Sequence, residues 1–174
     1  MGLFLQRFPV ISRTSIELLI SELENDFDYI TQNVKLYEKA LARVQSSFWN
    51  DELDLMVLGS CLHALYNAFE AYFFRIAKFF ENSIDKSMWY RDLLDRMALE
   101  IRGVRPALIS DRELFEKIDE LRRFRHLFRN LYKTKLHPEK LKIVSDAAQN
   151  IDAVFAVMHT NFVGWLRALT QALE

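Results

Sequence analysis

The chain has 174 residues, of which 51% are hydrophobic, and its formal net charge at pH 7 is −1. This length and composition exclude a disordered chain and predict one domain, residues 1–174, with a sizeable core. Only four Gly and three Pro are present, too few for the turns of a β protein, so an all-α fold is expected. The single Cys61 excludes an intramolecular disulfide and a Cys-rich zinc site, and it fits a reducing, cytoplasmic setting.

The first expected helix follows Thr14 or Ser15, either of which can cap it. Apolar side chains then recur at alternating steps of four and three residues, at Ile16, Ile20, Leu23, Phe27, Ile30, Val34, Tyr37, Leu41 and Val44. This heptad spacing predicts one long helix with an apolar seam. The seam either packs within the chain or also meets a second subunit.

A second helix is expected from Asp51 to about Phe80, after a break in the pattern at residues 46–50. It is apolar nearly all round, which indicates a central position in the fold. Its polar insertions His63, Tyr66 and Asn67 are interpreted as satisfied core groups. Its uncharged run, residues 55–69, is too short and too polar to span a bilayer, so no membrane association is expected.

A shorter third helix is expected after Ser87, carrying Trp89 to Leu99, and residues 102–109 form a connection with Gly and Pro. Ser110-Asp-Arg-Glu113 has the pattern of a capping box that opens a fourth helix. This fourth helix is expected to continue to Tyr132.

His137-Pro138 predicts the start of a fifth helix that runs to the C-terminus. The sequence therefore predicts an up-down bundle of four long helices plus one short helix, without a β-sheet.

The end of the expected fourth helix is strongly basic. From Arg122 to Lys142 there are eight Lys or Arg residues and one acid, Glu139, a local charge of +7 on a chain of net charge −1. Such a patch indicates a phosphate-binding surface, or else a solvated helix face. The four His residues lack metal-ligand spacing and no Gly-rich phosphate loop occurs, so neither a metal nor a cofactor is predicted.

Four residues of this stretch fit metal-independent cleavage of RNA. Such cleavage needs proton transfer from the 2′-hydroxyl and to the leaving 5′-oxygen, and a cation that stabilises the charged transition state. Arg125 and Arg129 match phosphate oxygens, His126 can shuttle protons, and Tyr132 can donate or stack on a base. We therefore interpret the stretch as a ribonuclease site; the alternative is an ordinary charged helix of a bundle.

The segment Phe124-Arg-His-Leu-Phe-Arg-Asn-Leu-Tyr132 resembles the signature of the HEPN superfamily in its HepT-like branch, which often reads Phe-Arg-His-x-Phe-Arg-His-x-Tyr. Residues 89–97 and 104–110, which read Trp-Tyr-Arg-Asp-Leu-Leu-Asp-Arg-Met and Val-Arg-Pro-Ala-Leu-Ile-Ser, are similar to a second family segment. That segment reads Trp-x-x-x-Leu-Leu-x-x-Met … Arg-Pro-x-x-Ile. The resemblance covers the chain from about Leu53 to Leu141.

This resemblance implies a helical bundle that dimerises, so that the Arg/His helices of two subunits form one RNA-cleaving cleft. It also implies a toxin paired with a nucleotidyltransferase antitoxin of the MntA type, which can adenylylate the motif tyrosine, here Tyr132. We expect catalytic roles for Arg125, His126, Asn130 and Tyr132, and RNA-binding roles for Arg122, Arg129 and Lys133.

The chain departs from the family pattern at Asn130, which occupies the position of the motif His. An amide can hold a hydroxyl or a phosphate oxygen, but it cannot exchange a proton near neutral pH. Three outcomes follow: His126 has taken over the proton transfer, or catalysis is much weakened, or the protein is an inactive relative that binds RNA or a partner.

Overall fold

The computed structural model describes residues 11–81, 89–130 and 136–173. The described part consists of helices and connections, with one isolated antiparallel bridge between Ile101 and Arg105 and no strand. The all-α bundle is thus confirmed. Its helices, in chain order, are α1 (Arg13–Ser46), α2 (Glu52–Glu81), α3 (Trp89–Met97), α4 (Arg112–Arg129), α5 (Pro138–Ala148) and α6 (Ile151–Ala172).

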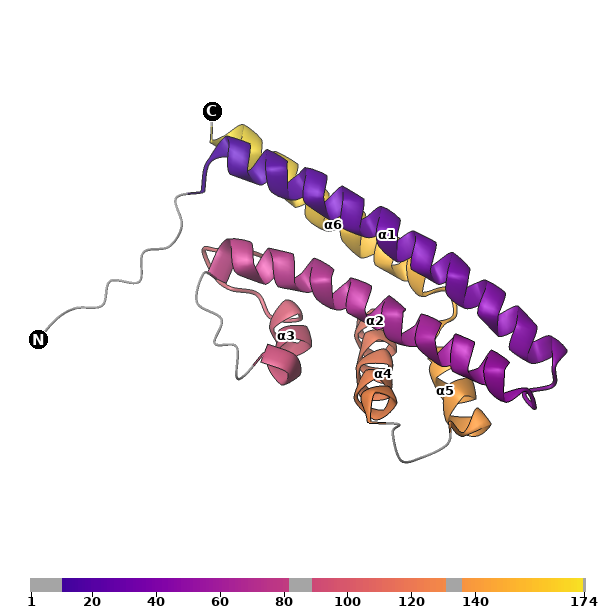
Figure 1. Ribbon diagram of the computed structural model, residues 1–174. Helices are drawn as coiled ribbons and strands as arrows, with labels where there is room; N and C mark the ends of the chain where they lie inside the picture. Colours follow the sequence, from indigo (N-terminus) through magenta and orange to yellow (C-terminus); the bar gives the residue numbers. More distant parts are fainter. Residues whose placement is uncertain (1–10, 82–88, 131–135, 174) are drawn as a thin grey trace, which may run out of the picture.

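The helices lie in two groups around α2 (Figure 1). On one side α1 runs along α2 and α6 runs along α1, while α3, α4 and α5 pack against α2 from the other side. The central position predicted for the second helix is therefore confirmed. No helix in the described ranges is long and apolar enough to cross a membrane.

Helix α1 forms where its heptad pattern predicts it, but its cap is Ser12 rather than Thr14 or Ser15. The Ser12 side chain accepts from the Ser15 backbone N–H at 3.2 Å, and the Ser12 N–H donates to the Ser15 hydroxyl at 3.0 Å, forming a capping box. Most of the predicted seam is buried within the chain, including Ile16 and Val44.

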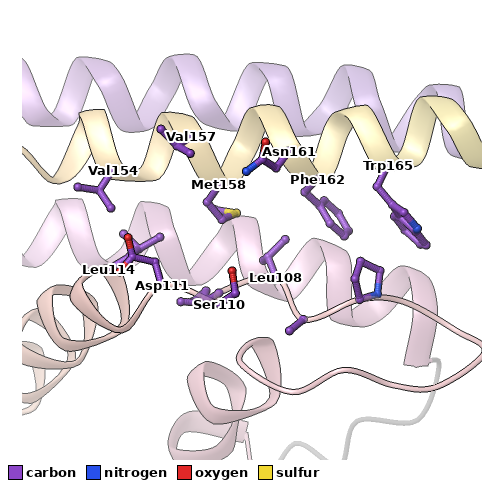
Figure 2. A pocket seen from close by; sticks show the side chains of 13 residues that line it. Leu108, Ser110, Asp111, Leu114, Val154, Val157, Met158, Asn161, Phe162 and Trp165 are labelled. Atoms are coloured by element: carbon purple, nitrogen blue, oxygen red, sulfur yellow. The ribbon is translucent and has the colours of Figure 1, made fainter.

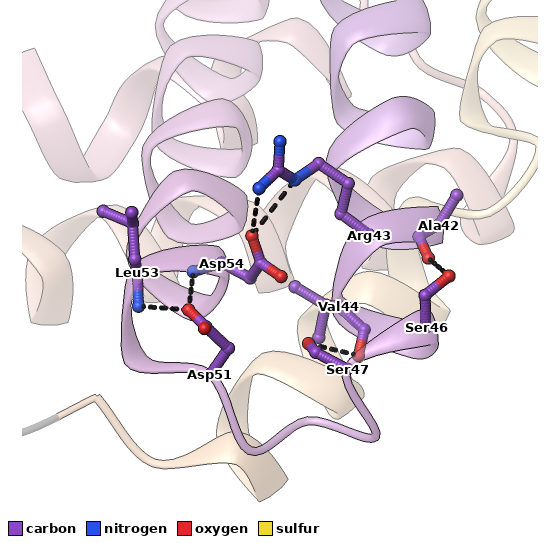
Figure 3. A network of polar contacts seen from close by, with 8 residues as sticks. All are labelled: Ala42, Arg43, Val44, Ser46, Ser47, Asp51, Leu53 and Asp54. Atoms are coloured by element: carbon purple, nitrogen blue, oxygen red, sulfur yellow. Dashed lines mark hydrogen bonds and ion pairs between the residues drawn. The ribbon is translucent and has the colours of Figure 1, made fainter.

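The turn between α1 and α2 is held by polar contacts (Figure 3). Asp51 accepts from the backbone N–H groups of Leu53 and Asp54, both at 2.9 Å, and so satisfies donors of the first turn of α2. Arg43 near the end of α1 binds the Asp54 carboxylate at 2.8 Å. These contacts fix the antiparallel packing of the two longest helices.

Two expected helix boundaries differ in the second half of the chain. The cap of α4 is Asp111, not Ser110, because the Asp111 carboxylate accepts from the Glu113 N–H at 2.7 Å. The expected fifth helix is two helices, since Asn150 adopts a left-handed conformation with φ 56° between α5 and α6. Asn tolerates this conformation better than most residues, so the break costs little.

Candidate active site

Helix α4 ends against the middle of α2, and this contact positions the basic residues. Phe124 is buried. The centroid of the Phe128 ring lies 5.6 Å from that of the Phe124 ring and 5.4 Å from that of the His63 ring of α2. A Cβ atom at Gly59 would lie only 2.8 Å from the Phe128 ring, so the absence of a side chain at Gly59 allows this close approach.

The last two turns of α4 line an open groove of about 530 Å³. All of the lining side chains are among the predicted site residues: Arg122, Arg125, His126, Arg129 and Asn130. The structure thus brings these five together on one surface. The other two predicted residues, Tyr132 and Lys133, lie outside the described residues.

Arg125 is the most firmly held cation of the groove. Its Nη1 donates to Oε1 of Glu70 at 2.9 Å, and both side chains are only 15% exposed. Its guanidinium lies over the Tyr66 ring, 5.4 Å from the centroid, a cation–π distance. Two residues of α2 therefore fix the orientation of Arg125.

Glu70 has an unusual electrostatic environment for a carboxylate. Burial raises its pKa above the ordinary value, whereas the charge and hydrogen bond of Arg125 and the charge of Arg129 act in the opposite direction. Neither Tyr66 nor Glu70 was among the predicted site residues. One signal in the sequence points to Glu70: it is the only charged residue between Leu55 and Phe74.

The other arginines of this region differ in how they are paired. Arg122 binds Asp119 at 2.6 Å, and Arg123 binds the same carboxylate at 2.6 Å. The local charge counted along the sequence therefore overstates the field of the patch. Arg129 is exposed, and no acidic side chain within the described ranges forms an ion pair with it.

Asn130 closes the helix that carries the groove. It is the C-cap of α4, where its backbone N–H donates to the Leu127 carbonyl at 3.1 Å. Its side-chain Nδ2 donates to the His126 carbonyl at 2.9 Å. The expected continuation of the helix to Tyr132 is therefore wrong, because α4 ends at Arg129. The position of the motif His is occupied by an exposed capping amide.

His63 and Asn67 lie on α2 behind the groove rather than in the central core. Asn67 Nδ2 and His63 Nδ1 are 3.3 Å apart. Burial lowers the pKa of His63, and the charges of Arg125 and Arg129 lower it further. Among the described residues, His63 Nε2 and Asn67 Oδ1 are buried without a hydrogen-bond partner, so these two are not the fully satisfied groups that the sequence suggested.

A second pocket, of about 310 Å³, lies between α6 and the segment that leads into α4 (Figure 2). Its walls are mainly apolar, with Leu108, Met158, Phe162 and Trp165 around it. It contains no basic residue, so it does not share the phosphate-binding character of the α4 groove. The groove is therefore the better candidate for the active site.

An all-α bundle with an Arg/His groove at the end of its fourth helix defines a HEPN-type module. The family model described as HepT-like protein matches residues 57–166, which is more than half of the chain. The chain therefore belongs to the HepT-like family, within the HEPN superfamily. No curated protein and no solved structure matches it.

Proposed function

We propose that this protein is the metal-independent endoribonuclease toxin of a HEPN–nucleotidyltransferase toxin–antitoxin pair, acting on RNA in the cytoplasm. The observation that carries the proposal is the groove itself. It places Arg125, His126 and Arg129 side by side at the end of α4, in a chain of the HepT-like family.

The groove offers the groups that metal-free RNA cleavage needs. Glu70 and Tyr66 hold Arg125 in one orientation, so its guanidinium is preorganised to stabilise a phosphorane-like transition state. Arg129, which is exposed beside it, supplies a second phosphate contact. In this proposal His126 transfers a proton, and Asn130 holds a hydroxyl or phosphate oxygen. Arg122 and Lys133 extend the RNA-binding surface.

An apolar face of α2 supports the proposed homodimer with the groove at its interface. Leu53 is 69% exposed, Val57 41% and Phe74 37%, which is unusual for apolar side chains on a central helix. At about 100° per residue, these positions spread over an arc of roughly 100° on the side of α2 opposite most of its buried residues. In the proposed homodimer, a second copy of the chain covers this side of α2.

The proposed antitoxin is a nucleotidyltransferase of the MntA type that adenylylates Tyr132. Tyr132 follows the groove residue Asn130 by two positions. An AMP group attached there would add bulk and negative charge beside Arg125 and Arg129, and would compete with RNA phosphate for them.

The alternative function is a HEPN dimer that binds RNA or a partner without cleaving RNA. The capping role of Asn130 favours it, because no proton-exchanging side chain stands at the motif position.

The test is cleavage of a mixed RNA pool in EDTA by the wild type, Arg125→Ala and Asn130→His. If the proposal is correct, the wild type cleaves RNA and Arg125→Ala loses about 10²–10³-fold in rate, as expected when a transition-state donor is removed. Arg112→Ala is the matched control, because Arg112 lies on the same helix, is 91% exposed and pairs only with Glu116 in the described contacts.

Two outcomes separate the candidates. An inactive wild type that binds RNA in a salt-dependent manner, together with an active Asn130→His variant, would establish the binding module. A wild type that neither cleaves nor binds any RNA would contradict the ribonuclease and the RNA-binding form of the alternative.

A further inference from the structure

We infer that Glu70 of α2, rather than a residue of the α4 motif, accepts the proton from the 2′-hydroxyl of RNA. This inference rests on the proposed ribonuclease activity and deepens it, because it assigns the base of that reaction to a different helix.

The need for a proton acceptor follows from Asn130. Its amide cannot take up a proton near neutral pH, and its Nδ2 is engaged with the His126 carbonyl at 2.9 Å. Among the described residues that line the groove, only His126 exchanges a proton near neutral pH. Cleavage by transfer to the 2′-oxygen needs both a base and an acid, and in this inference Glu70 is the base while His126 is the acid.

Glu70 does not line the groove itself, but it contacts a residue that does. Its Oε1 is 2.9 Å from Nη1 of Arg125, and Arg125 lines the groove. A guanidinium carries five N–H donors in a planar fork, so Arg125 can hold the Glu70 carboxylate and an RNA phosphate at the same time. In this inference the 2′-hydroxyl of the ribose next to that phosphate reaches the carboxylate, whose side chain is 15% exposed, beside the guanidinium rather than through it.

The environment of Glu70 suits a base that must also release its proton. Burial favours the neutral carboxyl and raises the pKa of Glu70, while Arg125 favours the ionised form. A carboxylate with a raised pKa takes up a proton more readily than an exposed one.

The step is balanced within the site. Glu70 takes the proton of the 2′-hydroxyl as the 2′-oxygen bonds to phosphorus. The bond from phosphorus to the 5′-oxygen breaks, and the 5′-oxygen receives a proton from the imidazolium of His126. The products are a 2′,3′-cyclic phosphate and a 5′-hydroxyl end, and proton exchange with water restores Glu70 and His126.

A purely structural role of Glu70 as the anchor of Arg125 makes different predictions. Glu70→Gln keeps the length of the side chain and an oxygen that accepts from Arg125, but it cannot take up the proton. If Glu70 is the base, this variant loses about 10²–10⁴-fold in cleavage rate, while its affinity for a non-cleavable 2′-deoxy oligonucleotide stays equal or rises. The acidic limb of the pH–rate profile, which reports ionisation of the base, disappears.

Glu113→Gln is the matched control, because Glu113 lies in the first turn of α4 and its side chain is 65% exposed. It should cleave at the wild-type rate. Glu70→Asp guards against a folding defect of the Gln variant, since it retains the charge that pairs with Arg125. Its carboxylate is about one methylene further from the groove, so it should lose about 10²-fold in rate.

The outcomes distinguish this inference from the proposed function. Wild-type rates in both Glu70 variants, with a clear loss in Arg125→Ala, would overturn the role of Glu70 and leave the ribonuclease intact. A wild type without any cleavage would overturn the ribonuclease, and the inference with it.

Discussion

The buried side chain of Arg105 holds together the segment between α3 and α4, which has little regular structure. Its side chain is 0% exposed, and it binds the Glu81 carboxylate of α2 at 2.8 Å. It also donates to the carbonyls of Arg96, Leu99 and Pro106, at 3.0, 3.1 and 3.1 Å. One guanidinium therefore ties the end of α2 to the end of α3 and to the connection that leads into α4.

We predict that Arg105→Ala destabilises the protein by about 3–5 kcal/mol. The Glu81 side chain is only 6% exposed, so removing Arg105 leaves a buried carboxylate with less compensation and several carbonyls without donors. Urea unfolding followed by circular dichroism measures the change in the free energy of unfolding.

The matched control is Arg167→Ala on α6. Arg167 also binds a carboxylate, that of Glu24 at 3.0 Å, but the two side chains are 63% and 49% exposed, so we expect a loss of only about 0–1 kcal/mol. Equal losses in the two variants would show that the burial of Arg105 does not matter.

For single residues, the sequence predicted which side chains share the groove, but it did not predict the contacts that hold each of them. Arg125 and Arg129 share one helical flank through spacing alone, but the partner of Arg125 is Glu70, 55 positions away. Helical periodicity contains no information about contacts between helices, so this ion pair could not be derived from it. The same limit explains why Asn130 was expected within a helix rather than at its cap.

Among the elements, the contact of α4 with α2 depends on the missing side chain at Gly59. We predict that Gly59→Ala destabilises the protein by about 1–3 kcal/mol, because the new methyl group would lie 2.8 Å from the Phe128 ring. Displacement of Phe128 also shifts Arg125 and Arg129, so RNA cleavage should fall with stability. Thermal unfolding and the cleavage assay together test this.

For Gly164→Ala in α6 we expect the opposite effect, a gain in stability. Nothing lies within 4 Å of a Cβ atom built at Gly164, so alanine meets no clash there. A helical Gly-to-Ala change without a clash stabilises by about 0.4–1 kcal/mol, mainly through the unfolded state. If Gly59→Ala were stabilising as well, the close approach of α4 to α2 would not be a constraint.

The elements themselves followed from the apolar pattern wherever one helix buries one continuous face. The heptad seam of α1 is an example, with Ile16, Leu23 and Tyr37 all buried. The division between α5 and α6 did not follow, since Val144, Ala148, Ile151 and Phe155 are buried on both sides of Asn150. An apolar pattern that continues across a change of direction cannot reveal that change.

At the scale of the whole molecule, a cluster of aromatic rings and one imidazole joins the three longest helices, α1, α2 and α6. The Tyr72 hydroxyl lies 2.9 Å from Nδ1 of His159, and the His159 ring stacks on Phe27 with 4.4 Å between centroids. The composition of the chain predicted a sizeable core. It could not predict a histidine at its centre, because the α6 pattern alone does not say what faces His159.

We predict that this cluster makes global stability sensitive to acid. Burial lowers the pKa of His159 below its usual value of about 6.5, so the unfolded chain binds a proton more readily than the folded one. The contribution of His159 to the free energy of unfolding is therefore fully present above about pH 6.5. It is lost as the pH falls from there through the lower pKa of the folded state.

Urea unfolding at pH 7.5 and at pH 5 measures this loss in the wild type, in His159→Gln and in His137→Gln. His159→Gln should be less stable at pH 7.5 but should show a smaller further loss at pH 5, because Gln does not titrate. His137 is exposed in front of α5, so His137→Gln should keep the full wild-type loss. An undiminished loss in His159→Gln would assign the acid sensitivity to other groups, of which His63, whose pKa is also lowered by burial, is the first to test.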